Sequence, residues 1–108
     1  MVREVQDLAE FKAILAEAGD KLVVVDFTAT WCGPCKQIGP EFVKESQKTE
    51  NNNVIFLKVD VDEAEDVSAF CKISCMPTFL FFKNGVKVDE FSGANKDTLV
   101  QKLEALRT

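Results

Sequence analysis

The chain has 108 residues, of which 46% are hydrophobic and 29% charged, and its formal net charge is −5. This composition is typical of one globular domain, residues 1–108, with an ordinary core. The chain has no cluster of Lys and Arg of the kind that binds a nucleic acid. No apolar run approaches the roughly 20 residues of a membrane span.

The first third of the chain predicts a strand, a helix and a buried strand. Val2 to Val5 suits a short edge strand, and Asp7 with Glu10 forms the capping-box pattern of a helix that ends at Gly19. Lys21 to Thr28 is almost continuously apolar. That pattern favours a central strand covered on both faces.

The middle of the chain predicts a helix and a second buried strand. Pro34 to Lys48 has helical spacing, with Ile38, Phe42 and Val43 expected to face the sheet. Val54 to Val59 is the next apolar run. It is expected to lie in the sheet beside the earlier strand.

A third helix is predicted after this strand. Asp62 with Glu65 offers a helix start, and the apolar face of the helix is expected to hold Val67, Phe70 and Cys71. This interpretation places Cys71 inside a helix.

The last part of the chain predicts a hairpin and a final helix. The runs Thr78 to Phe82 and Val86 to Phe91 are joined by a turn with Asn84-Gly85, a strong hairpin signal, and Asn95 caps the last helix. Strands that alternate with helices imply parallel pairing, and the hairpin adds an antiparallel pair. The expected fold is therefore α/β, a three-layer α/β/α arrangement with a mixed five-stranded sheet and four helices.

Cys32 and Cys35 lie at the turn between a predicted strand and a predicted helix. Backbone N–H groups at a helix start stabilise a thiolate and lower its pKa, and a second thiol within reach can close a disulfide. The pair therefore predicts dithiol–disulfide exchange. A zinc ion held together with Cys71 and Cys75 is a competing interpretation, and the helical position of Cys71 argues against it.

The two thiols are expected to play different roles. Cys32, at the turn, is expected to be the more exposed and to attack a substrate disulfide. Cys35, one turn inside the helix, is expected to be more covered and to resolve the mixed disulfide. Gly33 and Pro34 shape the turn, and the proline stiffens it.

Asp26 is the candidate base. The chain has no histidine, so proton transfer must use Asp, Glu, Lys, Cys or water. Burial in a central strand raises the pKa of Asp26, which suits a base that deprotonates Cys35. A hydrated Asp26 without a role stays open as an alternative, and Lys58 on the neighbouring strand is either its charge partner or a surface lysine.

Two positions near the second pair of cysteines stay open from the residues alone. Pro77 begins a strand, and its bond to Met76 is trans or cis. Cys75, in the connection before it, is either a regulatory or dimer-forming thiol or an ordinary reduced one.

The N-terminus lacks the apolar region of a signal peptide. In a reducing compartment a Cys-x-x-Cys pair is more often catalytic or metal-binding than structural. We therefore expect a cytoplasmic protein, with nuclear or secreted locations as alternatives.

Four stretches occur together in this order: Val-Asp-Phe at 25–27, Trp-Cys-Gly-Pro-Cys-Lys at 31–36, Met-Pro-Thr at 76–78 and Phe-Ser-Gly-Ala-Asn at 91–95. The whole chain resembles the cytosolic animal type of the thioredoxin family. One departure is Gly39, which stands where a lysine is common in that family.

The resemblance implies a thioredoxin fold and a general protein-disulfide reductase that serves electron transport and cell redox homeostasis. It implies that Cys32 attacks, that Cys35 resolves with help from Asp26, and that Pro77 is cis. It also implies an apolar substrate groove formed by Trp31, Met76, Pro77 and Gly93.

The resemblance further implies that no cofactor is bound beyond the redox-active Cys32–Cys35 disulfide, and no metal. Electrons are expected to come from NADPH through a flavoprotein thioredoxin reductase and to pass to oxidised proteins such as peroxiredoxin-type enzymes. The chain is expected to be a monomer, with Cys75 at a position where animal members can join two molecules. A disulfide oxidase or isomerase on the same fold and a redox-sensing binding module are the alternative functions.

Overall fold

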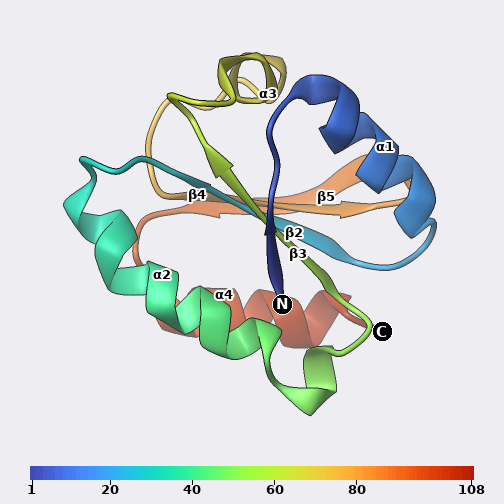
Figure 1. Ribbon diagram of the computed structural model, residues 1–108. Helices are drawn as coiled ribbons and strands as arrows, with labels where there is room; N and C mark the ends of the chain where they lie inside the picture. Colours follow the sequence, from blue (N-terminus) through green and yellow to red (C-terminus); the bar gives the residue numbers. More distant parts are fainter.

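A five-stranded mixed sheet forms the middle layer of the computed structural model, which describes residues 1–108, and helices cover both of its faces (Figure 1). The strands are β1 (Val2–Glu4), β2 (Val23–Thr28), β3 (Ile55–Asp60), β4 (Thr78–Lys83) and β5 (Val86–Ser92). The helices are α1 (Leu8–Ala18), α2 (Gly33–Ser46), α3 (Glu65–Phe70) and α4 (Lys96–Leu106), with a short 3-10 turn at Thr49–Asn51. The predicted fold class is confirmed.

The central position of β2 is also confirmed. The sheet order is β1-β3-β2-β4-β5. β3 pairs parallel with both β1 and β2, whereas β4 pairs antiparallel with β2 and β5. A strand with a partner on each edge and a helix layer on each face is shielded from water, which is why its sequence is so apolar.

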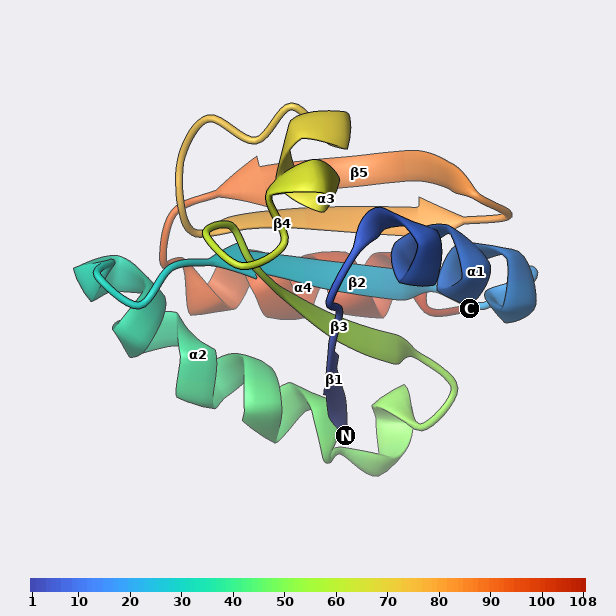
Figure 2. The same cartoon turned by 45° about the horizontal axis from the view of Figure 1, so that its top comes forward.

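Alternation along β2 divides the core into two clusters, one on each face of the sheet. Val23, Val25 and Phe27 pack in the cluster that includes side chains of α1 and α3, and Val24 packs in the cluster with α2 and α4. Figure 1 and Figure 2 show the helices α1 and α3 on one side of the sheet and the helix α2 on the other. Asp26 shares the face of Val24, because side chains two residues apart point the same way.

Aromatic contacts fix α2 on that face. The Phe42 ring lies 5.2 Å from the Phe56 ring and 5.6 Å from the Phe79 ring, centroid to centroid. Such pairs contribute about 0.5–1.5 kcal/mol each beyond their burial. They hold α2 against β3 and β4, and therefore hold the start of α2 near the end of β2.

The element boundaries agree with their local signals, with one difference at α1. The Asp7 carboxylate accepts the Glu10 N–H at 2.9 Å, as a helix cap should. The Glu10 carboxylate bonds to the Gln6 N–H at 2.7 Å, one residue before the N–H that the capping box predicts. At the β4–β5 hairpin, Asn84 and Gly85 have φ of 54° and 75°, the left-handed values that a tight hairpin turn requires.

The predicted third helix was wrong at both ends. α3 begins at Glu65, after Ala64, and ends at Phe70, so Asp62 does not cap it and Cys71 lies just beyond it. The ring of Phe70 is exposed beside the Lys12 ammonium, 4.8 Å from the ring centroid, instead of facing the core. Val67 is buried in the core and the half-buried Cys71 packs against it, as predicted.

Val43 differs from its prediction in part, since it is exposed to solvent although its side chain lines the space between α2 and the sheet. Ile38 and Phe42 of the same helix are buried as predicted. No helix in the structure combines the length and the apolar character that crossing a membrane requires.

Candidate active site

The chain leaves the central strand and enters α2 through the cysteine pair. Cys32 is the N-cap residue of α2, and its sulfur accepts the Cys35 N–H at 3.2 Å. The two residues form a disulfide, with their Cα atoms 5.3 Å apart. The sulfur of Cys32 therefore occupies the place where a helix N-terminus stabilises negative charge.

The expected difference in exposure between the two cysteines was wrong. Cys32 and Cys35 are each 5% exposed in the disulfide form. The reason is that Cys32 packs with Ala29 in a small apolar cluster that Met76 also covers. Exposure therefore gives no ground for telling the attacking thiol from the resolving one.

Asp26 is buried where the sequence predicted. It is 4% exposed, and its Oδ1 atom has no hydrogen-bond partner in the protein. Burial raises the pKa of Asp26 from its ordinary 3.8 to about 7, and the positive charge of Lys58 opposes part of that rise. Lys58 is exposed, yet stands beside Asp26 in the parallel register of β2 and β3, so both interpretations of this lysine hold in part.

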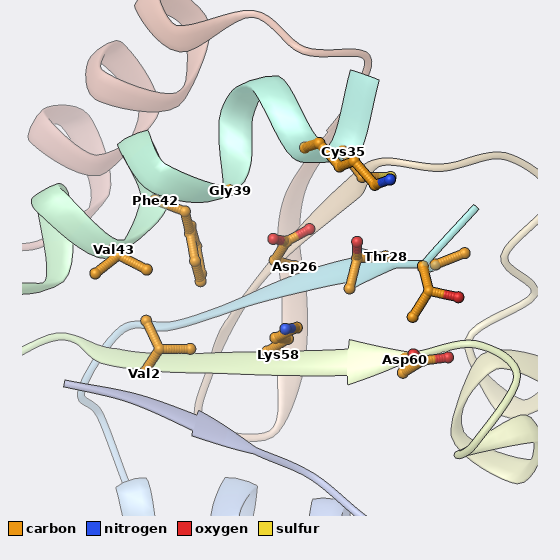
Figure 3. Close-up of a pocket in the computed structure, with 12 residues that line it drawn as sticks. Val2, Asp26, Thr28, Cys35, Gly39, Phe42, Val43, Lys58 and Asp60 are labelled. Carbon is orange, nitrogen blue, oxygen red and sulfur yellow. The ribbon is translucent and has the colours of Figure 1, made fainter. Parts of the chain in front are cut away.

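A cavity of about 270 Å³ connects Asp26 with one of the two cysteines. Cys35 lines it, whereas Cys32 does not. Figure 3 shows the Asp26 carboxyl on β2 below α2, with Cys35 on the helix above it. The geometry therefore associates the buried acid with Cys35.

The four residues of the expected groove gather around the disulfide. The Met76–Pro77 peptide is cis, and the Met76 carbonyl oxygen lies 3.7 Å from the Cys32 sulfur. The Gly93 N–H donates to the Pro77 carbonyl at 3.0 Å, which joins the two loops. Trp31 precedes Cys32 in the chain and is 65% exposed. The half-buried Met76 is the apolar side chain that packs against the two cysteines.

One site residue was missed from the sequence. The Trp31 Nε1–H donates to the Asp62 carboxylate at 2.8 Å, which orients the indole. The sequence pattern instead predicts Asp62 at the start of the third helix. The sequence does hold a signal for this contact. Trp31 follows β2 and Asp62 follows β3, and the carboxyl ends of these two parallel strands lie at the same edge of the sheet.

The other two cysteines are free and lie apart from the disulfide. Cys75 is exposed, and its sulfur lies 3.4 Å from Ser92 Oγ and 3.6 Å from Thr78 Oγ1. These hydroxyls hold the pKa of Cys75 below its usual range, whereas burial raises the pKa of Cys71 to about 11. The disulfide uses two of the four sulfurs, and the structure contains no cluster of three or more His, Cys, Asp or Glu placed to hold a metal ion.

Comparisons with known proteins agree on one family. The Thioredoxin family model matches residues 2–105. A thioredoxin of Ictalurus punctatus is 63% identical over 103 residues, which cover 95% of this chain and 96% of the relative.

Solved structures agree as well. The thioredoxin of Malassezia sympodialis has a TM-score of 0.93 at 44% identity and covers 99% of this chain and 94% of its own. A chain from a structural study of thiol resolution in yeast mitochondrial 1-Cys peroxiredoxin through the glutathione/thioredoxin systems has a TM-score of 0.88 at 34% identity, covering 97% and 95%.

Replacing Asp26 by asparagine should stabilise the protein in a pH-dependent way. Between pH 4 and about 7 the unfolded chain ionises Asp26 while the folded chain keeps it protonated, so wild-type stability falls as pH rises and levels off above 7. Asp26→Asn removes this loss, so the free energy of unfolding of the variant should exceed that of the wild type by up to about 4 kcal/mol above pH 7, and the difference should vanish near pH 3. Urea unfolding of both proteins across this pH range measures the difference. A gain that does not change with pH would show that Asp26 titrates normally.

Proposed function

The chain belongs to the thioredoxin family, and on that basis we propose how its Cys32–Cys35 pair passes electrons to other proteins. Its activity is that of a protein-disulfide reductase, which works by dithiol–disulfide exchange. The observation that carries this function is the Cys32–Cys35 disulfide at the start of α2. The pair is itself the redox group.

In the first step, Cys32 acts as the nucleophile on a substrate disulfide. Its place at the N-cap of α2, where the sulfur accepts the Cys35 N–H, supports this role, because that position favours the thiolate. The thiolate forms a bond to one substrate sulfur, and the bond between the two substrate sulfurs breaks. The leaving sulfur takes a proton from water, and a mixed disulfide remains on Cys32.

In the second step, Cys35 resolves the mixed disulfide. Asp26 takes the Cys35 proton, directly or through water in their shared cavity, and the raised pKa of Asp26 suits this transfer near neutral pH. The Cys35 thiolate then attacks the sulfur of Cys32, and the bond between Cys32 and the substrate sulfur breaks. The departing substrate sulfur takes a proton from water, and the substrate is released as a dithiol. Two electrons have passed from the protein to the substrate, and the Cys32–Cys35 disulfide results.

The substrate lies along the loops that face the disulfide. We expect an apolar groove there for an extended segment of the oxidised protein. Its support is the exposed Trp31, the half-buried Met76 and the backbone hydrogen bond that links Gly93 to Pro77. The Asp62 carboxylate holds the indole at the edge of this groove.

Electrons return to the disulfide from NADPH through thioredoxin reductase. Members of the family are generally reduced by this enzyme and act on oxidised proteins. Peroxiredoxin-type enzymes are proposed as substrates, and the similar chain from the yeast peroxiredoxin study supports this choice.

The proposed location is the cytoplasm, where this exchange would serve electron transport and redox homeostasis. The free thiols of Cys71 and Cys75 support a reducing compartment, because unpaired cysteines persist there. Cys75 is also the proposed link of an oxidised dimer, since it is exposed and has a lowered pKa.

Insulin reduction driven by NADPH and thioredoxin reductase tests the assignment of the two cysteines. Cys32→Ser should abolish turnover without forming an adduct, because the nucleophile is gone. Cys35→Ser should also lose turnover but accumulate a mixed disulfide with insulin, visible by mass spectrometry. The opposite pattern, with the adduct on Cys35 in the Cys32→Ser variant, would reverse the roles.

Oxidant treatment tests the proposed dimer. The wild-type chain should form a covalent dimer on a non-reducing gel, and Cys75→Ser should abolish it because the exposed thiol is removed. Cys71→Ser is the matched control and should still dimerise, since burial raises the pKa of Cys71 and lowers its reactivity. A dimer that persists in Cys75→Ser would point to another thiol.

A further inference from the structure

The cavity that joins Asp26 to Cys35 is large enough for a small molecule. It measures about 270 Å³ and lies between α2 and the strands β2 and β3 (Figure 3). A cavity of about 150 Å³ suffices for benzene. One aromatic ring with a substituent therefore fits this volume.

The cavity contains one buried polar atom that lacks a partner. Asp26 is 4% exposed, and its Oδ1 atom accepts no hydrogen bond from the protein. A buried acceptor without a donor costs free energy, so a molecule that donates a hydrogen bond there is favoured. This feature selects a ligand with a hydrogen-bond donor.

The charges around the cavity do not select an ion. Asp26 and Asp60 are buried acids on its walls, and Lys36 and Lys58 are exposed bases that also line it. Asp60 already accepts the Asp62 N–H at 2.9 Å. Both lysines are exposed to water, which screens their charges, and burial leaves Asp26 only partly ionised near pH 7. The walls therefore present no strong charge of either sign, which favours a neutral ligand.

The remaining walls are partly apolar, formed by Phe42, Val43, Val2 and Ala29, and partly polar, formed by Thr28 and Thr30. Gly39 of α2 also lines it, and a Cβ atom added there would meet no atom within 4 Å. Gly39 lies in the middle of the α2 face that lines the cavity, between Cys35 and Val43, so a longer side chain at position 39 would extend toward it.

We propose that this cavity binds small neutral aromatic molecules that carry one hydrogen-bond donor, of which phenol is the simplest. The ring lies against Phe42 and Val43, and the hydroxyl donates to Asp26 Oδ1. The effect on catalysis rests on the proposed function: a ring in this position separates Asp26 from Cys35 and slows the release of the mixed disulfide.

Phenol binding to the oxidised protein tests the site. Two-dimensional amide NMR at pH 7 should show millimolar binding, with shifts confined to β2, β3 and α2. Toluene has the same shape without the donor, and should bind about tenfold more weakly. Absence of phenol binding, or equal affinity for toluene, would overturn the proposal.

Matched variants locate the ligand. Gly39→Lys should abolish phenol binding because the side chain occupies the cavity. Gln37→Lys adds the same charge at an exposed position of the same helix and should bind phenol as the wild type does. Val43→Phe, at a partly exposed wall position, offers a second way to narrow the cavity if the first variant fails to fold. Unchanged binding in a folded cavity variant would place phenol elsewhere and overturn the proposal.

The binding measurement uses no turnover, so it is independent of the mechanism. Amide shifts that are confined to β2, β3 and α2 and that disappear in Gly39→Lys would support the site. A ring bound there that left mixed-disulfide release unchanged would contradict the role of Asp26 in the proposed function, while the site itself would stand.

Discussion

An acid without a partner in the central strand is the constraint on which this site depends. Asp26 lies on β2 with strands on both sides and α2 above it, and its Oδ1 atom has no donor within the protein. Burial disfavours its charged form, and the exposed Lys58 relieves only part of that cost. The protein therefore gives up stability near neutral pH to keep an ionisable carboxyl group in the cavity below Cys35, a trade often found at functional sites.

The rest of the fold brings reactive groups to that acid. β2 ends where α2 begins, so Cys32 caps the helix while Cys35 lies one turn further, over the cavity. The aromatic contacts of Phe42 hold α2 against the sheet. The loop at Pro77, joined to Gly93 by a backbone hydrogen bond, places the Met76 carbonyl oxygen 3.7 Å from the Cys32 sulfur.

Local signals in the sequence predicted most of these elements, and contacts between distant segments explain the differences. The apolar run of β2, the Asn84-Gly85 turn and the cap at Asp7 depend on neighbours along the chain, and each is where the pattern indicated. The local pattern at Asp62 predicts a helix start and does not reveal its bond to the Trp31 indole, because that bond joins segments 31 residues apart. Equal burial of the two cysteines was missed for the same reason, since Met76 comes from a distant loop to cover them.

The central claim is that Asp26 accepts the proton of Cys35, and the pH dependence of mixed-disulfide release tests it most directly. Single-turnover kinetics would follow that step for the wild-type chain and for Asp26→Asn. The wild-type rate should fall as pH drops through about 7, where Asp26 becomes protonated, and the variant should be slower at neutral pH and lack this titration. Identical rates and profiles for the two proteins would contradict the account.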